Sequence, residues 1–165
     1  MVSREATKQD YGKISQLYKR LEPNSPLWMC WCASGYREWH KAGYLEEKVK
    51  TEGRRFFIAE DETGKIRACI FADKSDVPEI KFWKDFGSFI ELIDAETDNR
   101  QFYYEVLSLM EKTALKEGIE FFEFGAMDFY HTWIKAFFGN KMESFIEEEN
   151  RPVMGKIWRC RVNLK

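Results

Sequence analysis

The sequence lacks the patterns that mark a metal centre or a fold held together by disulfides. It has only four cysteines, none of them in a Cys-x-x-Cys pair, and only two histidines. Zinc is usually held by closely spaced cysteines and histidines. We therefore predict no metal site, and we expect the cysteines to be reduced and mostly buried, as in a cytoplasmic protein.

Long apolar runs and clusters of basic residues are also missing. No run approaches the roughly 20 apolar residues of a transmembrane helix, and the N-terminal residues lack the apolar core of a signal peptide. The net charge is −2 and the isoelectric point is near 5.8. A general nucleic-acid binder would need a basic surface instead. The sequence thus predicts a cytoplasmic protein with no nucleic-acid partner and no membrane partner.

Aromatic residues, in contrast, are abundant, at 16% of the 165 residues. They fit a phenylalanine-rich core, an aromatic-lined ligand cavity, or both. A chain of this length, 44% apolar and 33% charged, suits one globular domain with a real core. No repeat, low-complexity segment or linker divides it, so we predict a single domain over residues 1–165.

The centre of the chain has the pattern of a strand, a helix and a second strand. Residues 86–94 and 119–127 are short apolar runs rich in aromatic and β-branched residues. Between them an apolar face recurs at helical spacing, formed by Tyr103, Val106, Leu107, Met110, Ala114 and Leu115. Asp98, followed by Gln101, fits a capping box at the helix start. We predict a parallel βαβ unit, with a ligand crevice where the first strand ends and the helix begins.

Further elements are predicted on both sides of this unit. They cover residues 2–6 (strand), 7–21 and 27–52 (helices), 56–60 and 66–72 (hairpin), 128–138 (helix), and 142–149 and 153–162 (strands). Thr7 with Asp10 marks the first helix start, and residues 74–85 have the composition of a loop. The predicted fold class is α/β (α+β), with a mixed, mostly antiparallel central sheet of six to seven strands. The parallel βαβ unit lies at its centre, and about four helices accompany it.

This order of elements resembles the GNAT superfamily of acetyl-CoA-dependent N-acetyltransferases. The likeness is carried by residues 4–10 with their Thr-x-x-Asp helix start, the hairpin 57–66, and the helix end 110–118 with the strand and short helix after it. That last helix closes at Phe138-Gly139, so the likeness spans nearly the whole chain. It implies acetyl-CoA as co-substrate and direct transfer of its acetyl group, in a ternary complex, to a primary amine of a small molecule or peptide.

Two motifs of that superfamily are missing here. Its pyrophosphate motif, Gln/Arg-x-x-Gly-x-Gly/Ala, would fall at residues 98–103, where Phe102 and Tyr103 replace small residues. Small residues let backbone N–H groups approach the pyrophosphate; Arg100 can compensate in part, since its guanidinium forks onto phosphate. The tyrosine that the superfamily often places four residues before the closing Gly-Phe corresponds to Lys135. A second hypothesis is therefore a catalytically inactive GNAT-like ligand-binding or protein-interaction module.

The resemblance also implies candidate site residues. Glu91 is a candidate general base, Tyr130 a donor to the departing thiolate, and His131 a base near neutral pH. The cofactor-binding candidates are Ile93, Asp94, Ala95, Asn99, Arg100, Gln101 and Phe102. The substrate-binding candidates are Trp28, Trp31 and Glu148. Plainer roles stay open for all of them: solvent-facing charges, core aromatics and the start of a helix. The acceptor, and the choice between a monomer and a homodimer, are also open.

Overall fold

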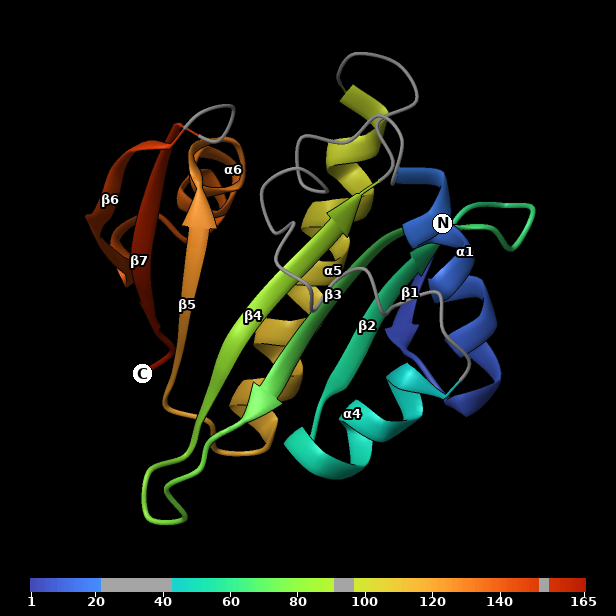
Figure 1. The fold of residues 1–165 in the computed structure, drawn as a ribbon, viewed down its shortest axis with the longest axis horizontal. Helices are drawn as coiled ribbons and strands as arrows, with labels where there is room; N and C mark the ends of the chain where they lie inside the picture. Colours follow the sequence, from blue (N-terminus) through green and yellow to red (C-terminus); the bar gives the residue numbers. More distant parts are fainter. Residues whose placement is uncertain (22–42, 91–96, 152–154) are drawn as a thin grey trace.

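A seven-stranded sheet with the order β1-β2-β3-β4-β5-β7-β6 forms the centre of the molecule (Figure 1). The computed structural model describes residues 1–21, 43–90, 97–151 and 155–165. The strands are β1 (Val2–Glu5), β2 (Arg55–Glu60), β3 (Ile66–Lys74), β4 (Phe82–Ile90), β5 (Phe121–Met127), β6 (Met142–Arg151) and β7 (Gly155–Asn163). Among these described strands, β4 and β5 pair in parallel and the other neighbours are antiparallel. The predicted mixed, mostly antiparallel sheet with one parallel pair is confirmed.

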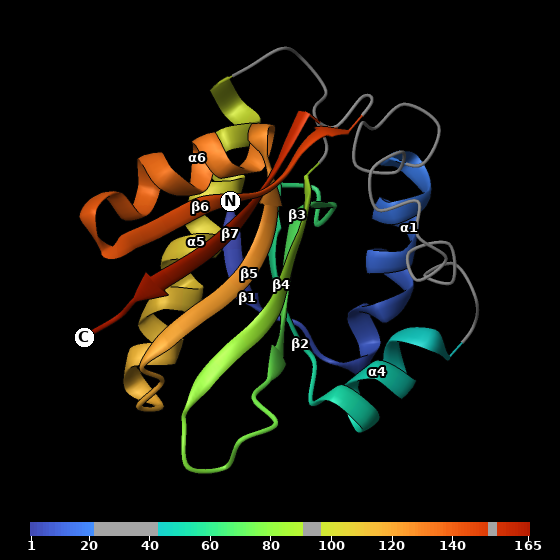
Figure 2. The same ribbon diagram turned by 60° about the vertical axis from the view of Figure 1, so that its left-hand side comes forward.

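Helices cover both faces of this sheet (Figure 2). Helices α1 (Tyr11–Leu21) and α4 (Tyr44–Glu52) lie on one face, and α5 (Thr97–Lys116) and α6 (Asp128–Phe138) lie on the other. Because successive side chains of a strand point to opposite faces, β2 supplies Phe57 to the core under α5 and Phe56 to the core under α1. None of the helices in the described part of the chain is long and apolar enough to cross a membrane.

The entry into the first helix is fixed by Thr7 and Asp10, as predicted. The Thr7 backbone N–H donates to the Asp10 carboxylate at 2.7 Å, and the Asp10 N–H donates to the Thr7 carbonyl at 2.9 Å. Both carboxylate oxygens of Asp10 also accept bonds of 2.7 Å from Arg4. The carboxylate is therefore buried but fully partnered, as a buried charge has to be. Residues 8–10 form a 3-10 turn that leads into α1.

The prediction of a loop over residues 74–85 is confirmed for residues 75–81 and wrong at both ends, which belong to strands. β3 runs to Lys74 and β4 begins at Phe82, which leaves residues 75–81 as the connection. The pairing with β3 passes from Gly87 to Lys84 across a bulge that contains Asp85, whose φ is +52°. A bulge inserts an extra residue and breaks the period-two alternation of apolar and polar side chains. The polar residues around Asp85 were therefore not recognised as part of a strand.

Helix α5 packs the predicted face, with one exception. Tyr103, Val106, Leu107, Met110 and Ala114 are fully buried. Leu115, which we placed on the same face, is 46% exposed, so that assignment is wrong. Each residue advances a helix by about 100°, and Leu115 therefore falls beside the stripe that faces the sheet. The following strand, β5, begins at Phe121, two residues later than predicted.

Candidate active site

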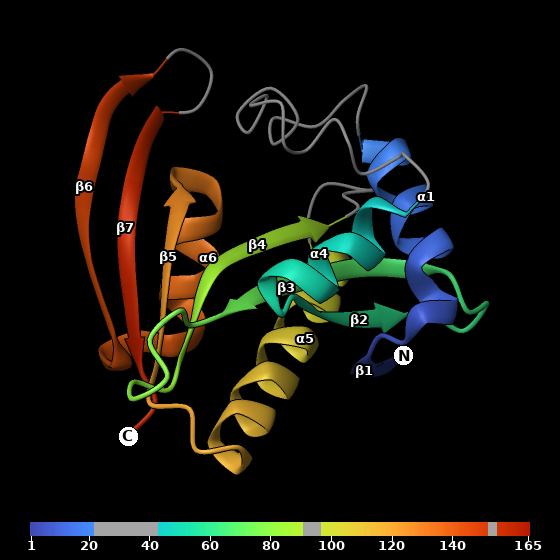
Figure 3. The same cartoon turned by 60° about the horizontal axis from the view of Figure 1, so that its bottom comes forward.

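The two parallel strands at the centre of the sheet pair over a short distance and then separate. β4 and β5 are paired at Phe82–Phe121, Trp83–Phe122 and Lys84–Glu123. Beyond this point the described pairs of β4 are with β3, and those of β5 are with β7. Figures 1 and 3 show the two strands spreading apart toward their carboxyl ends. We call this region the β4–β5 divergence; the bulge at Asp85 lies directly after the last pair.

Aromatic side chains pack on the α5 side of the β4–β5 divergence. Phe86 of β4 and Phe124 of β5 stack with ring centroids 4.6 Å apart. Two residues further along β4, the Ser88 hydroxyl lies 2.9 Å from the hydroxyl of Tyr103, whose side chain is fully buried. The Tyr103 ring contacts two rings of α6, Tyr130 at 5.8 Å and Trp133 at 5.7 Å. Tyr103, Tyr130 and Trp133 form what we call the aromatic cluster.

Among the cofactor-binding candidates, Arg100 has the clearest contact with this region. It is exposed in the first turn of α5, and its guanidinium lies 5.2 Å from the centre of the Trp133 ring. A guanidinium at this distance from an indole ring is attracted to its face. This contact draws the cation toward α6, beside the first N–H groups of α5, which have no partner within the helix. Gln101 is exposed, and Phe102 is half-buried against the core.

The two catalytic candidates of α6 point in different directions. Tyr130 is 4% exposed and belongs to the aromatic cluster, on the α5 side. His131 stacks on Trp158 of β7 at 4.0 Å, and its Nε2 lies 2.9 Å from the Ser144 hydroxyl of β6. The structure therefore does not bring these two side chains together.

The surroundings of His131 keep its ring uncharged at neutral pH. Burial lowers the pKa of His131 below its usual value, and the nearby charge of Lys135 lowers the pKa further, while Asp128 opposes them. Asp128 is the first residue of α6. Its carboxylate accepts hydrogen bonds from β7, from the Trp158 Nε1–H at 2.6 Å and from the Lys156 N–H at 3.1 Å. The carboxylate thus joins α6 to β7.

Several predicted site residues lie outside the described part of the structure. These are Glu91, Ile93, Asp94, Ala95, Trp28 and Trp31, together with the side chains of Asn99 and Glu148. The backbone of Glu148 is described and pairs with Ile157 across β6 and β7. Lys135, which occupies the expected tyrosine position, donates to the Met142 carbonyl at 3.1 Å. The proposed roles of all these residues stay predictions.

Two residues of the site were missed by sequence reasoning. Ser88 was noted only as part of a strand, although a lone hydroxyl within an apolar run signals a buried partner. Trp133 was expected only as part of the helix over residues 128–138, although it contacts both Tyr103 and Arg100. Neither contact could be found from the sequence, since they join α5 to β4 and to α6.

The cysteines and acidic residues form no metal centre in the described residues. No group of three or more metal-binding side chains occurs there. Cys69 and Cys160 are buried free thiols. Burial raises the pKa of Cys160 to about 12 and raises that of Cys69 as well. Both are therefore protonated, unreactive core residues, as expected; Cys30 and Cys32 lie outside the described residues.

Comparison with known proteins decides the fold. No protein-family model matches the sequence, and no curated protein matches it. Solved structures do match: a GNAT-family acetyltransferase from Staphylococcus aureus Mu50 aligns over 99% of both chains, with a TM-score of 0.65 and 13% identity. This chain has the GNAT acetyltransferase fold.

Other acetyltransferases share this GNAT fold at similar distances. Spermidine N-acetyltransferase from Vibrio cholerae, solved with CoA and spermine, has a TM-score of 0.67 at 12% identity, covering 99% of this chain and 95% of its own. Aminoglycoside 6'-acetyltransferase type Ii has a TM-score of 0.62 at 16% identity, covering 100% and 98%. The resemblance inferred from the sequence is confirmed for the fold; identities this low do not carry the activity across.

Proposed function

We propose that this GNAT-fold protein is an N-acyltransferase that moves the acetyl group of acetyl-CoA to a primary amine. The observation that carries the proposal is the β4–β5 divergence, where two parallel strands stop pairing after Lys84 and Glu123. The edge of β4 that this separation frees can pair with the amide groups of a pantetheine arm, in the manner of an added strand. Support comes from the spermidine N-acetyltransferase of the same fold, which was solved with CoA.

The diphosphate of the cofactor would lie at the start of α5. The first N–H groups of this 20-residue helix have no partner within the helix and carry its partial positive charge. Arg100, oriented by Trp133, adds a full positive charge at the same place. It would supply part of the anion binding that backbone N–H groups supply where the glycine-containing pyrophosphate motif is present. Asn99, Gln101 and Phe102 would line the same end of the cofactor.

The reaction requires one base and one acid. The amine nitrogen attacks the thioester carbonyl, the C–N bond forms, and the C–S bond breaks to release the thiolate of CoA. A base takes the proton that the amine loses, and we assign this role to Glu91, with His131 as the second candidate because its ring is uncharged at neutral pH. Tyr130 would protonate the thiolate, and Trp28, Trp31 and Glu148 would bind the amine acceptor.

One observation favours a second candidate function. The fully buried Tyr103 lies where the resemblance implies a small residue, and its hydroxyl is 2.9 Å from that of Ser88 on the α5 side of the β4–β5 divergence. A side chain of this size opposes the close approach of a pantetheine arm from that side. The alternative is therefore a catalytically inactive GNAT-like module that binds another ligand or a protein.

Cofactor binding tests the proposal. Thermal unfolding with 1 mM acetyl-CoA should show a midpoint raised by several degrees, because a ligand that binds only the folded state stabilises it. The Arg100→Glu variant should bind acetyl-CoA about tenfold more weakly by calorimetry. Lys112→Glu makes the same charge change at an exposed position of the same helix and should bind as the wild type does.

The outcomes separate the two candidate functions. Binding of acetyl-CoA together with release of CoA in the presence of polyamine, aminoglycoside or peptide amines supports the acyltransferase. The absence of any shift at millimolar acetyl-CoA rejects it and leaves the inactive module. Equal affinities of the Arg100→Glu and Lys112→Glu variants would remove Arg100 from the cofactor site.

A further inference from the structure

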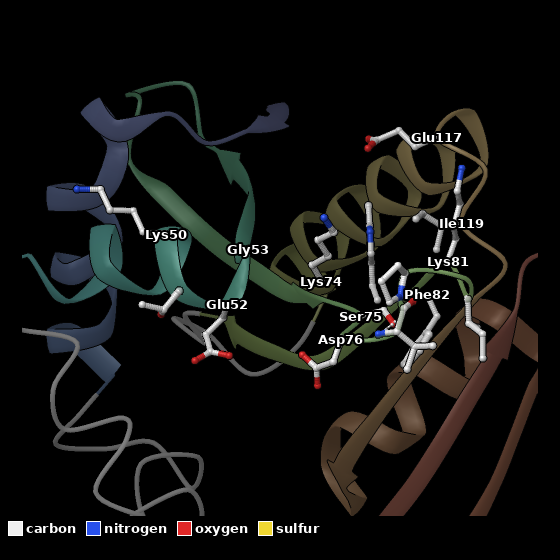
Figure 4. Close-up of a pocket in the computed structure, with 15 residues that line it drawn as sticks. Lys50, Glu52, Gly53, Lys74, Ser75, Asp76, Lys81, Phe82, Glu117 and Ile119 are labelled. Carbon is white, nitrogen blue, oxygen red and sulfur yellow. Dashed lines mark hydrogen bonds between the residues drawn. The ribbon is translucent and has the colours of Figure 1, made fainter.

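A hollow lies at the end of β4 opposite to the β4–β5 divergence. It is bounded by Glu52 and Gly53 at the end of α4, by residues 75–78, 80 and 81 of the connection between β3 and β4, and by Glu117 and Ile119 after α5 (Figure 4). Its volume is about 720 Å³, within the roughly 300–1,000 Å³ that is typical of sites for small organic ligands. We call it the Trp83 hollow.

Part of the lining of the Trp83 hollow is apolar and firmly held. Trp83 is 5% exposed and stacks on Phe57 at 5.6 Å and on Phe122 at 5.4 Å, so its ring cannot turn away. Val77 and Ile80, on the connection between β3 and β4, are more than 40% exposed at its rim. Exposed apolar side chains beside a hollow are a mark of a binding site for an apolar group.

The walls are fixed by backbone contacts. The connection is closed by hydrogen bonds from the Ser75 N–H to the Phe82 carbonyl and from the Ile80 N–H to the Val77 carbonyl. Gly53, with φ +62°, turns the chain so closely past Lys74 that an added Cβ would lie 2.9 Å from the Lys74 Cβ. The hollow is thus formed by the fold before any ligand arrives.

The lining holds three carboxylates and three lysines, and one of the lysines, Lys50, is paired with Glu46 outside the hollow. Each carboxylate is already paired with a cation: Asp76 with Lys84, Glu117 with Arg55 at 2.7 Å, and Glu52 with Lys48 at 3.8 Å. Lys74 and Lys81, in contrast, lie in no ion pair within the described residues. Figure 4 shows their side chains pointing away from the carboxylates of Glu52 and Asp76. The two lysines are therefore available to an anion.

We propose that the Trp83 hollow binds a small amphipathic organic anion, such as a medium-chain carboxylate. Its apolar part would lie against Phe82, Trp83 and Ile80, and its anionic group would face Lys74 and Lys81. The site is separate from the cofactor site proposed above, because it lies where β4 begins and the cofactor site lies beyond its paired part. The two proposals are therefore independent of each other.

The test uses octanoate as the probe, with acetate and octanol as matched compounds. Octanoate should shift the backbone amide NMR signals of residues 50–53, 75–83 and 117–119. Acetate carries the charge without the chain, and octanol carries the chain without the charge, so each should bind at least tenfold more weakly. Because acetyl-CoA is absent, the result does not depend on the acyltransferase proposal.

Charge reversal supplies the second arm of the test. The Lys74→Glu/Lys81→Glu double variant should lose at least tenfold in octanoate affinity. The control is Lys112→Glu/Lys156→Glu, which changes the net charge equally at exposed positions outside the hollow and should keep the wild-type affinity. The same NMR spectra report whether each variant is folded. Signals shifted only around Ser88, Arg100 and Tyr130, no shifts at all, or equal affinities of both double variants would overturn the proposal.

Discussion

The hydroxyl of Tyr103 lies 2.9 Å from the hydroxyl of Ser88, and this bond joins α5 to the part of β4 that has separated from β5. The Tyr103 side chain is fully buried, and a buried hydroxyl without a partner is costly. The pair thus fixes the distance between the helix and the strand beside the proposed cofactor site.

Loss of this bond should be measurable as a loss of stability. Tyr103→Phe should lower the free energy of unfolding by about 1 kcal/mol, the usual contribution of one buried hydrogen bond. Ser88→Ala should cost a similar amount, and the double variant should cost less than the sum, because both changes remove the same bond. Urea denaturation measures all three. Tyr104→Phe is the control. The hydroxyl of Tyr104 has no hydrogen bond among the described residues, so its removal should leave the free energy of unfolding nearly unchanged. Strictly additive effects would show that the bond contributes nothing.

The buried carboxylate of Asp10 predicts a loss of stability in acid. Its hydrogen bonds from Arg4, assisted by the Thr7 N–H, hold the pKa of Asp10 well below its usual range although burial opposes this. A lowered folded-state pKa contributes stability that is present above the unfolded-state pKa of about 3.9 and is lost as the pH falls below it. Asp10→Asn should therefore lower the free energy of unfolding at pH 7 by about 2 kcal/mol, and this difference should narrow below pH 4.

Urea denaturation at pH 7 and pH 3 tests this expectation. Glu62→Gln, at an exposed position of the β2–β3 turn, is the matched control and should leave the pH dependence unchanged. A difference between wild type and Asp10→Asn that stays constant from pH 7 to pH 3 would contradict it.

His131 should titrate below the usual value for histidine. Burial is the main cause of its lowered pKa, with Lys135 acting in the same direction and Asp128 against it. The unfolded chain, with a pKa of about 6.5 at this residue, takes up the proton first, so stability is present above that pH and falls as the pH drops. NMR titration of the His131 ring should give a midpoint below pH 6.5. The His131 signal is assigned as the one that is missing from the spectrum of the His131→Gln variant. A midpoint at or above 6.5 would show that Asp128 dominates.

Two glycines should respond to alanine in opposite directions. Gly53 has φ +62° and lies against Lys74, so Gly53→Ala should destabilise the fold by about 1–2 kcal/mol. Gly12 is exposed in α1, with nothing within 4 Å of an added Cβ. Gly12→Ala should therefore raise the free energy of unfolding by about 0.5–1 kcal/mol. Thermal unfolding of both variants measures this. Similar effects of the same sign would show that the turn at Gly53 adapts to a side chain.

The sequence by itself determined the order of elements and much of the core. The helical spacing of Tyr103, Val106 and Leu107 predicted the buried face of α5, and Thr7 with Asp10 predicted the first helix start. These features depend on neighbours within a few residues, where periodicity and capping act. The same local rules failed at Asp85, because its bulge interrupts the strand pattern of β4.

Only the tertiary structure decided what surrounds the candidate site. The bond between Tyr103 and Ser88, the contact of Arg100 with Trp133, and the stacking of His131 on Trp158 each join different elements. The separation of β4 from β5 likewise depends on which strands each of them pairs with. Such contacts depend on how helices and strands pack against one another, and the chain between the partners carries no local pattern that encodes them.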